Sequence, residues 1–154
     1  MSVGGIFELR TPRALLDKAV HDLERLRQDP TDAYAAFDFF VTARHLPEWI
    51  FPNDMVKCDT LFKSHVELRI CRHIADSGKH YIVRDPRHKQ VRATEGTQST
   101  WGNSWSRAWG DSWGRLDLLI RLDPADPDTC TSGTDISALE LAEKTLAILQ
   151  KFTP

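Results

Sequence analysis

Histidine and arginine side chains are concentrated in the segment HVELRICRHIADSGKH. Its charged and imidazole groups include His65, Arg69, Arg72, His73, Asp76, Lys79 and His80. Residues four apart lie on one side of a helix, so His65, Arg69 and His73 would share a face. A histidine that removes the 2′-hydroxyl proton of RNA, with a cation on the phosphate, can cleave a phosphodiester without metal. The segment therefore holds the residue types that such a cleavage needs.

A simpler interpretation makes the same segment a solvated helix face. Glu67 and Asp76 would then pair with the arginines, and a histidine would bond a backbone group. A zinc site is disfavoured because helical zinc ligands usually have HExxH-like spacing with a third ligand. The zinc ligands considered are His65, His73, His80, His88 and Cys71.

The sequence contains an acidic loop but none of the common calcium-loop or cofactor motifs. The loop carboxylates Asp123, Asp126, Asp128 and Asp135 lack the order of an EF-hand and its terminal glutamate. The chain has no GxGxxG, P-loop or GxSxG motif. We therefore predict no metal and no cofactor.

The segment around Arg72 resembles the Arg-to-His motif of HEPN domains. The resemblance is carried by Arg72, the polar His73 after it, and His80, with seven residues between Arg72 and His80, a longer interval than is usual. HEPN domains are helical bundles that often act as ribonucleases and commonly dimerise. The resemblance thus implies a metal-independent ribonuclease of toxin or defence type, with His80 as base, Arg72 as phosphate ligand and His73 as auxiliary group. The stretches DAYAAFDFFVTARHLPEW, CRHIADSGKHY and ISALELAEKTLAIL are also similar to small uncharacterised bacterial proteins of phages and mobile elements.

A tandem repeat rich in tryptophan is the second candidate site. The segment WGNSWSRAWGDSWG holds Trp101, Trp105, Trp109 and Trp113. A spacing of four puts every ring on one face of a strand and lets a helical stripe drift by only about 40° per step. The rings either cover the helices or form an exposed platform for a partner chain, a sugar or bases. Nearby cations suited to such a platform are Arg92, Arg107, Arg115 and Arg121.

Composition bounds the remaining function classes. The chain has 154 residues, is 41% hydrophobic and 27% charged, and carries a net charge of −2, which gives no global electrostatic reason to bind nucleic acid or an anionic membrane. The N-terminal MSVGGIFELR does not read as a signal peptide, and no apolar run approaches the roughly 18 residues of a membrane span. Three cysteines without CxxC spacing favour free thiols in the cytoplasm. We expect a cytoplasmic protein without membrane contact.

Apolar periodicity and capping residues predict four helices, over 11–28, 32–46, 60–77 and 137–152. Thr11-Pro12 begins the first, and a Ser137/Glu140 capping box begins the last. Pro47 is expected to stop or kink the second helix, ahead of a packed connector LPEWIFP, and Gly78 to follow the third. The expected buried faces contain Leu15, Leu16, Ala19, Val20, Leu23 and Leu26; Tyr34, Phe37, Phe40 and Val41; Leu61, Phe62, Val66, Ile70 and Ile74; Leu139, Ala142, Leu146 and Leu149.

The region 80–122 is predicted to hold the strands together with the tryptophan repeat. HYIVR, KQVRAT and RLDLLIRLD have strand character, and DPADPDTCTSGTD is interpreted as a loop. Helices followed by strands and a closing helix are typical of an α-rich α+β fold. The sequence therefore predicts a single domain over 1–154, a bundle of about four helices with a small antiparallel sheet of two to three strands.

The most economical function is that of a small accessory protein that acts by binding. Self-association or a protein partner is expected, with Trp101, Trp105, Trp109, Trp113 and Arg107 as the contact surface. The alternative is the HEPN-like ribonuclease, with RNA as its substrate.

Overall fold

The structure is a computed structural model that describes residues 5–79, 90–96, 117–123, 126 and 135–154. These residues form five helices and three strands, which confirms the α-rich α+β prediction. The helices are α1 (Pro12–Gln28), α2 (Ala33–Ile50), α3 (Met55–Ser64), α4 (Val66–Lys79) and α6 (Ala138–Phe152); the strands are β1 (Val91–Gly96), β2 (Leu118–Leu122) and β3 (Asp135–Ser137). The expected strand HYIVR and the whole tryptophan repeat lie outside the described residues.

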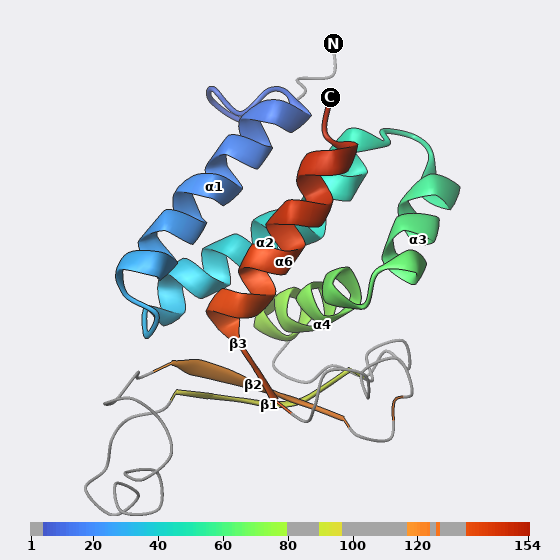
Figure 1. Cartoon of the computed structure of the whole chain (residues 1–154). Coiled ribbons are helices and arrows are strands. Elements are labelled where there is room, and N and C mark those ends of the chain that lie inside the picture. The colour runs from blue at the N-terminus through green and yellow to red at the C-terminus, as the bar shows by residue number, and fades with distance from the viewer. Residues whose placement is uncertain (1–4, 80–89, 97–116, 124–125, 127–134) are drawn as a thin grey trace, which may run out of the picture.

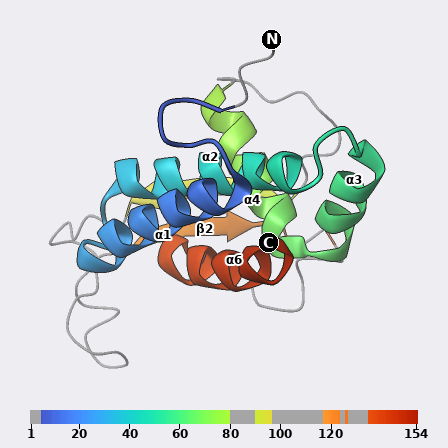
Figure 2. The ribbon, with the colours of Figure 1, turned by 90° about the horizontal axis from the view of Figure 1, so that it is seen from above.

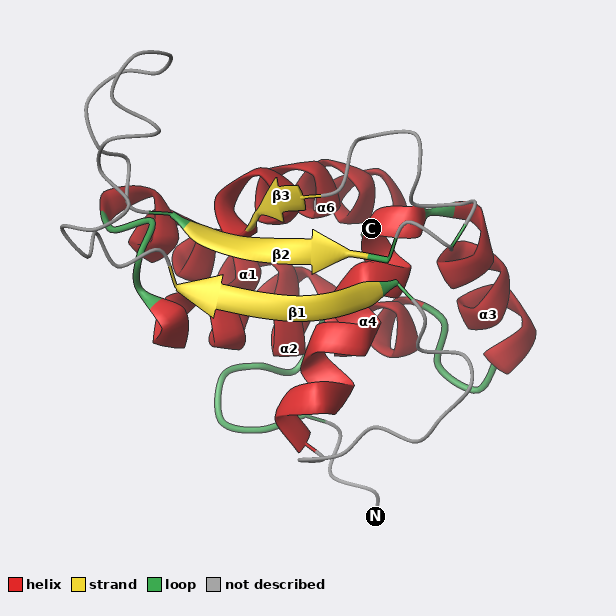
Figure 3. Ribbon diagram, turned by 90° about the horizontal axis from the view of Figure 1, so that it is seen from below, coloured by secondary structure: helices red, strands yellow, loops and turns green. Residues whose placement is uncertain are grey.

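The helices form one layer and the sheet lies across one side of it (Figure 1). Seen from above, α1, α2 and α6 lie over β2, and α4 runs across them (Figure 2). The sheet is antiparallel with β2 between β1 and β3 (Figure 3). Ile120 on β2 pairs with Ile136 on β3, and both are buried beneath the helices. The sequence does not predict β3, because three residues are too few for a periodic pattern.

Helix α1 begins and ends where its sequence signals lie. The Thr11 hydroxyl accepts a hydrogen bond from the Ala14 amide at 3.1 Å, and Pro12 occupies the first turn, where no amide donor is needed. Asp29 ends the helix in extended backbone ahead of Pro30. The expected inner stripe is buried, at Leu15, Leu16, Ala19, Leu23 and Leu26, with Val20 half-buried.

A charged network that the sequence did not reveal joins α1 to α2. The Asp22 side chain is only 3% exposed and accepts a hydrogen bond from the Lys18 ammonium. Lys18 also donates to the Thr42 hydroxyl at 3.0 Å. Arg25 lies 3.6 Å from Asp22 and donates to Asp38 at 2.9 Å, a bond that raises the pKa of Arg25. These contacts fix how α1 and α2 are aligned.

Helix α2 continues through Pro47 to Ile50, so the predicted connector at 46–52 is wrong over its first five residues. A proline costs the helix the hydrogen bond of its own nitrogen. Here the ring is fully buried, and burial offsets that loss. The Pro47 carbonyl accepts hydrogen bonds from the Phe51 amide at 3.0 Å and from the Cys58 thiol at 3.1 Å. Pro47 therefore lies inside the packed end of the helix.

The single helix predicted over 60–77 is two helices that meet at His65, which has extended backbone. Asp54 begins α3 earlier than expected, because its carboxylate accepts the Lys57 amide at 3.0 Å. The Arg69 guanidinium donates to the carbonyl of Phe62 at 3.2 Å and to that of Lys63, and so satisfies carbonyls at the end of α3. A side chain of α4 thus caps the helix before it.

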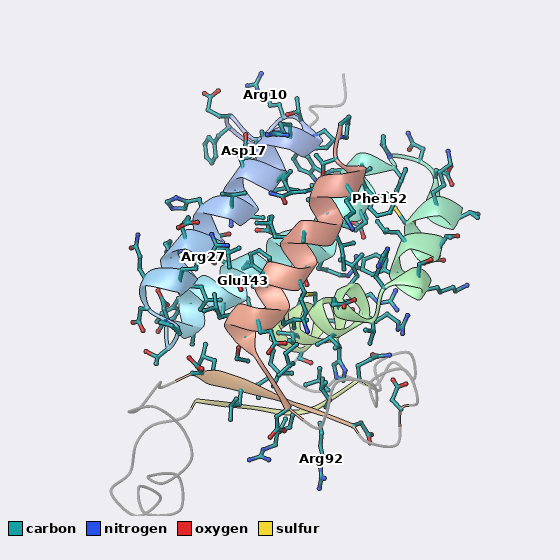
Figure 4. All side chains as sticks on the ribbon, in the orientation of Figure 1. Arg10, Asp17, Arg27, Arg92, Glu143 and Phe152 are labelled. Atoms are coloured by element: carbon teal, nitrogen blue, oxygen red, sulfur yellow. The ribbon has the colours of Figure 1, made fainter. Side chains whose placement is uncertain are left out.

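Helix α6 returns across the bundle and is tied to α1 by an ion pair. The Ser137 hydroxyl accepts the Glu140 amide at 3.1 Å, as the capping pattern predicts. Arg27 of α1 donates to Glu143 of α6 at 3.1 Å, and the two side chains point toward one another (Figure 4). Ala142, Leu146 and Leu149 are buried as expected, with Leu139 half-buried.

The reactivity of the two described cysteines, Cys58 and Cys71, measures how well the core excludes solvent. Burial raises the pKa of the Cys71 thiol to about 12, against a partly opposing hydrogen bond with Thr145. Burial also raises the pKa of the Cys58 thiol. In a Cys130→Ser variant we expect no reaction of the folded protein with a disulfide reagent at neutral pH, and reaction of both thiols in urea.

The same thiol makes stability depend on alkaline pH. An unfolded thiol ionises near its usual value of 9.0 and the buried Cys71 near 12, so unfolding releases a proton in that range. The contribution of Cys71 to stability is present below pH 9.0 and is lost as the pH rises toward 12. A Cys71→Ala variant should lose this part of the pH dependence in urea titrations; an unchanged profile would contradict the assignment.

Candidate functional site

The α4 residues expected to share one catalytic face have separate structural contacts. Arg69 caps α3, as described above. His73 is buried, and its Nδ1 accepts a hydrogen bond from the Val91 amide of β1 at 3.1 Å. This amide lies beside a β-bulge, where the register of β1 against β2 shifts between Val91 and Ala93. His80 lies outside the described residues. His73 therefore attaches the edge of the sheet to the helical layer.

Arg72 contacts an aromatic ring that a second arginine, Arg44, also contacts. Its guanidinium carbon is 4.8 Å from the centroid of the buried Phe62 ring, and that of Arg44 on α2 is 5.5 Å from the same centroid. Both distances are in the range of cation–π contacts. Phe62 thus brings two cations from different helices together. Their spacing of 28 positions in the chain left no local sequence signal.

Carboxylates balance the charge of this cluster. Arg44 donates to Glu48 at 2.7 Å and lies 3.6 Å from Asp76, while Glu48 also contacts the Nδ1 of His45 at 3.3 Å. Burial opposes ionisation of Glu48, but the hydrogen bonds of Arg44 and His45 outweigh it, so the pKa of Glu48 lies below its usual value. The carboxylate is ionised at neutral pH. An added phosphate would therefore compete with Glu48 and Asp76 for the arginines.

The solvent-facing side of α2 differs most from expectation. The apolar repeat predicts that Tyr34, Phe37 and Val41 are buried. Tyr34 and Phe37 are instead 82% and 46% exposed, and Val41 is half-buried. Phe40 is buried as predicted. The helix is apolar on most sides, so periodicity alone did not identify its inner face. The side that packs combines large and small apolar residues, Ala35, Ala36, Phe39, Phe40, Ala43 and Leu46.

We call the solvent-facing side of α2 the outer face. In helical projection its members are Tyr34, Phe37, Val41, Arg44, His45 and Glu48. The Phe37 ring is held at one edge by α4, because a Cβ on Gly78 would lie 2.4 Å from its Cε2 atom. Gly78 lies within α4, which ends at Lys79, and not just past the helix as predicted.

Two of the arginines predicted to serve the stacking platform, Arg92 and Arg121, are among the described residues. Arg92 points away from the helices (Figure 4) and is exposed. Arg121 is also exposed and lies 3.8 Å from Asp135 on the neighbouring strand. Its neighbours Ile120 and Leu122 are buried, so alternation puts Arg121 on the open side of the sheet. The tryptophans and Arg107 lie outside the described residues.

The described residues contain neither a metal-ligand cluster nor a helix suited to span a membrane. No group of three metal-ligating side chains converges there. No helix there is both long enough and apolar enough to span a bilayer. Comparison of the chain with models of protein families, with curated proteins and with solved structures gave no match.

The contact between Gly78 and Phe37 predicts that Gly78→Ala destabilises the protein, although alanine favours a helix more than glycine does. Replacing glycine by alanine within a helix normally stabilises it by about 1 kcal/mol. We expect Gly78→Ala instead to lower the free energy of unfolding by about 1 kcal/mol, because the new methyl group displaces the Phe37 ring. In a Phe37→Ala background the same substitution should raise the free energy by about 1 kcal/mol. Urea titration of the four proteins checks this; equal effects in both backgrounds would contradict the contact.

Proposed function

We propose that this chain is a small accessory protein that works by self-association through the outer face of α2. The exposure of Tyr34 and Phe37 on a helix whose opposite side is fully packed carries the proposal. A helix that is apolar on most sides is normally covered on most sides. Aromatic residues are also the type most enriched at the centres of interfaces.

Other exposed apolar side chains are less suited to this role. Ile6 and Phe7 lie on the N-terminal turn, and Met55 and Val56 lie at the start of α3. Scattered exposed apolar residues are normal on a protein surface. The outer face differs because its apolar groups lie on successive turns of one rigid helix.

Sedimentation velocity over a range of concentrations tests the proposal. We expect a reversible dimer in the wild-type chain with a dissociation constant on the order of micromolar, since one helix face gives an interface at the small end of the usual range. Phe37→Ser and Tyr34→Ser should abolish it. Val56→Ser is the matched control, because Val56 is 76% exposed on another helix. A monomeric wild-type chain, or dimerisation equally sensitive to Val56→Ser, would contradict the proposal.

The tryptophan repeat remains part of the proposal as a second contact surface. Its support is the four-residue spacing of the rings together with the exposed Arg92 and Arg121 on the open side of the sheet. A variant with Trp105 and Trp109 both replaced by serine separates the two surfaces in the same experiment. Loss of association in this variant, with Phe37→Ser silent, would move the contact to the repeat.

The proposal also takes the chain to work in the cytoplasm. Cys58 and Cys71 are free thiols. Free buried thiols fit a reducing compartment, where disulfides are rare.

A second candidate function, metal-independent RNA cleavage with the HEPN-like residues, has one supporting observation. Arg72 and Arg44 both contact the Phe62 ring, so two groups of a type that binds phosphate lie near the same side chain. His80 would act as base, and His73, tied to β1 through Nδ1, would be auxiliary. An assay on single-stranded RNA with EDTA present tests this. Cleavage lost in folded Arg72→Ala and His80→Ala variants would support it, and no cleavage would remove it.

A further inference from the structure

Helix α3 is the most exposed of the helices that the structure describes. It stands at the side of the bundle, where its main neighbours are α2 and α4 (Figure 1). Only Cys58, Leu61 and Phe62 of its ten residues are buried, and the other seven are exposed. A helix of ten residues has little stability of its own in water. The packing of these three side chains therefore holds α3 in its helical form.

The backbone on both sides of α3 interrupts the ladder of helical hydrogen bonds. Before the helix, Asn53 has a φ of 66°, and the Asp54 amide donates to the Phe51 carbonyl at 3.2 Å, which closes a turn. After the helix, His65 has extended backbone. Helical structure propagates along an unbroken ladder. Loss of α3 therefore does not spread through the backbone into α2 or α4.

The charged groups beneath α3 keep their partners without it. Arg44 of α2 donates to Glu48 at 2.7 Å and lies 3.6 Å from Asp76 of α4. These ion pairs lie within and between α2 and α4, so they persist when the Phe62 ring moves away. The Arg69 bonds to the last carbonyls of α3 would be exchanged for bonds to water. Removal of α3 thus leaves no buried charge uncompensated.

We infer that α3 is a separately unfolding segment, which detaches from α2 and α4 and loses its helical structure while the other helices and the sheet stay folded. Segments with few buried apolar contacts are those that open at the lowest free energy. Detachment transfers Leu61 and Phe62 to water and takes the Phe62 ring away from Arg44 and Arg72. The segment thus controls how much of the two guanidinium groups solutes can reach.

The detached form is a minor population, because Leu61 and Phe62 leave a buried environment when it forms. Cys58 therefore stays unreactive during a thiol assay of ordinary length. Hydrogen exchange accumulates rare openings over hours, so it is the measurement suited to this segment.

A substitution far from α3 tests the inference by hydrogen exchange, followed by NMR where rates report the opening equilibrium. Leu23 is fully buried in α1, on the opposite side of the bundle from α3 (Figure 1). We expect Leu23→Ala to accelerate exchange at the slowest amides of α1 and α6 about 30-fold or more, because the cavity destabilises the bundle. The Leu61 and Phe62 amides should keep their wild-type rates. Leu23→Val, with about threefold acceleration in α1, serves if Leu23→Ala does not fold.

Two substitutions on α3 distinguish detachment from fraying of the helix in place. Leu61→Ala removes a buried side chain and should accelerate exchange at the Phe62 amide about 30-fold or more, because less burial is lost on detachment. Val56→Ala is the matched control on the exposed side of the same helix and should leave that rate within about threefold.

Two results would overturn the inference. If Leu23→Ala accelerates the α3 amides as much as those of α1, then α3 exchanges only when the whole protein unfolds. If exchange at Phe62 is insensitive to Leu61→Ala, then the helix opens without leaving α2 and α4.

Discussion

Replacing Asp22 by asparagine is expected to lower the free energy of unfolding by about 3 kcal/mol. Removing one partner of a buried ion pair typically costs about 3–5 kcal/mol, because the other charge remains uncompensated. The cost here lies at the low end, since Lys18 and Arg25 are 35% and 36% exposed and can regain water. Urea titration followed by circular dichroism at neutral pH measures the change.

Two further variants show whether the effect comes from the buried charge. Asp17→Asn removes an exposed pair with Arg13, whose side chains are 66% and 65% exposed, and should change stability by less than about 0.5 kcal/mol. Replacing Lys18 by methionine and Asp22 by leucine together should recover most of the loss, since an apolar pair of similar volume has no charge to desolvate. An Asp22→Asn variant as stable as Asp17→Asn would show that the network contributes nothing.

Replacing His73 by alanine is expected to cost about 2 kcal/mol and to loosen β1. The substitution removes a buried side chain and takes the acceptor from the Val91 amide, and an unsatisfied buried donor alone costs about 1–3 kcal/mol. Hydrogen exchange at the Val91 amide should accelerate more than exchange in α1. The measurement is exchange monitored by mass spectrometry or NMR alongside urea titration.

The conservative and surface variants sharpen this second result. His73→Asn keeps an acceptor on a short side chain and should recover part of the protection at Val91. His45→Ala changes a histidine whose side chain is 53% exposed, and should leave both stability and exchange unchanged. If His73→Ala leaves exchange at Val91 as it was, the hydrogen bond does not hold the sheet.

The sequence predicted the helices whose ends are marked by local chemistry. The hydroxyls of Thr11 and Ser137 accept hydrogen bonds from nearby amides, so the first residues of α1 and α6 can be predicted closely. The break at His65 could not be read in the same way. The apolar repeat continues across it, and the group that caps α3 is Arg69, which belongs to the next helix.

The surface of α2 was mispredicted for a different physical reason. Tyr34 and Phe37 lie at helical spacing from Val41, so periodicity groups them on one apolar face. The face that packs is the one that holds Phe39, Phe40 and Leu46, and two apolar faces on one helix cannot be told apart by periodicity alone. The contacts of Arg44 and Arg72 with Phe62, and the network around Asp22, join positions on different helices. A local sequence pattern cannot predict such contacts.

Ser137 is both the last residue of β3 and the capping residue of α6, so no linker separates the sheet from the closing helix. A displacement of α6 along its axis must therefore pull on β3, and through the β3–β2 hydrogen bonds on the middle of the sheet. The C-terminal helix and the edge strand β3 are thus expected to move together. Tension applied to α6 would therefore reach the sheet through Ser137 and α1 through the Arg27–Glu143 contact.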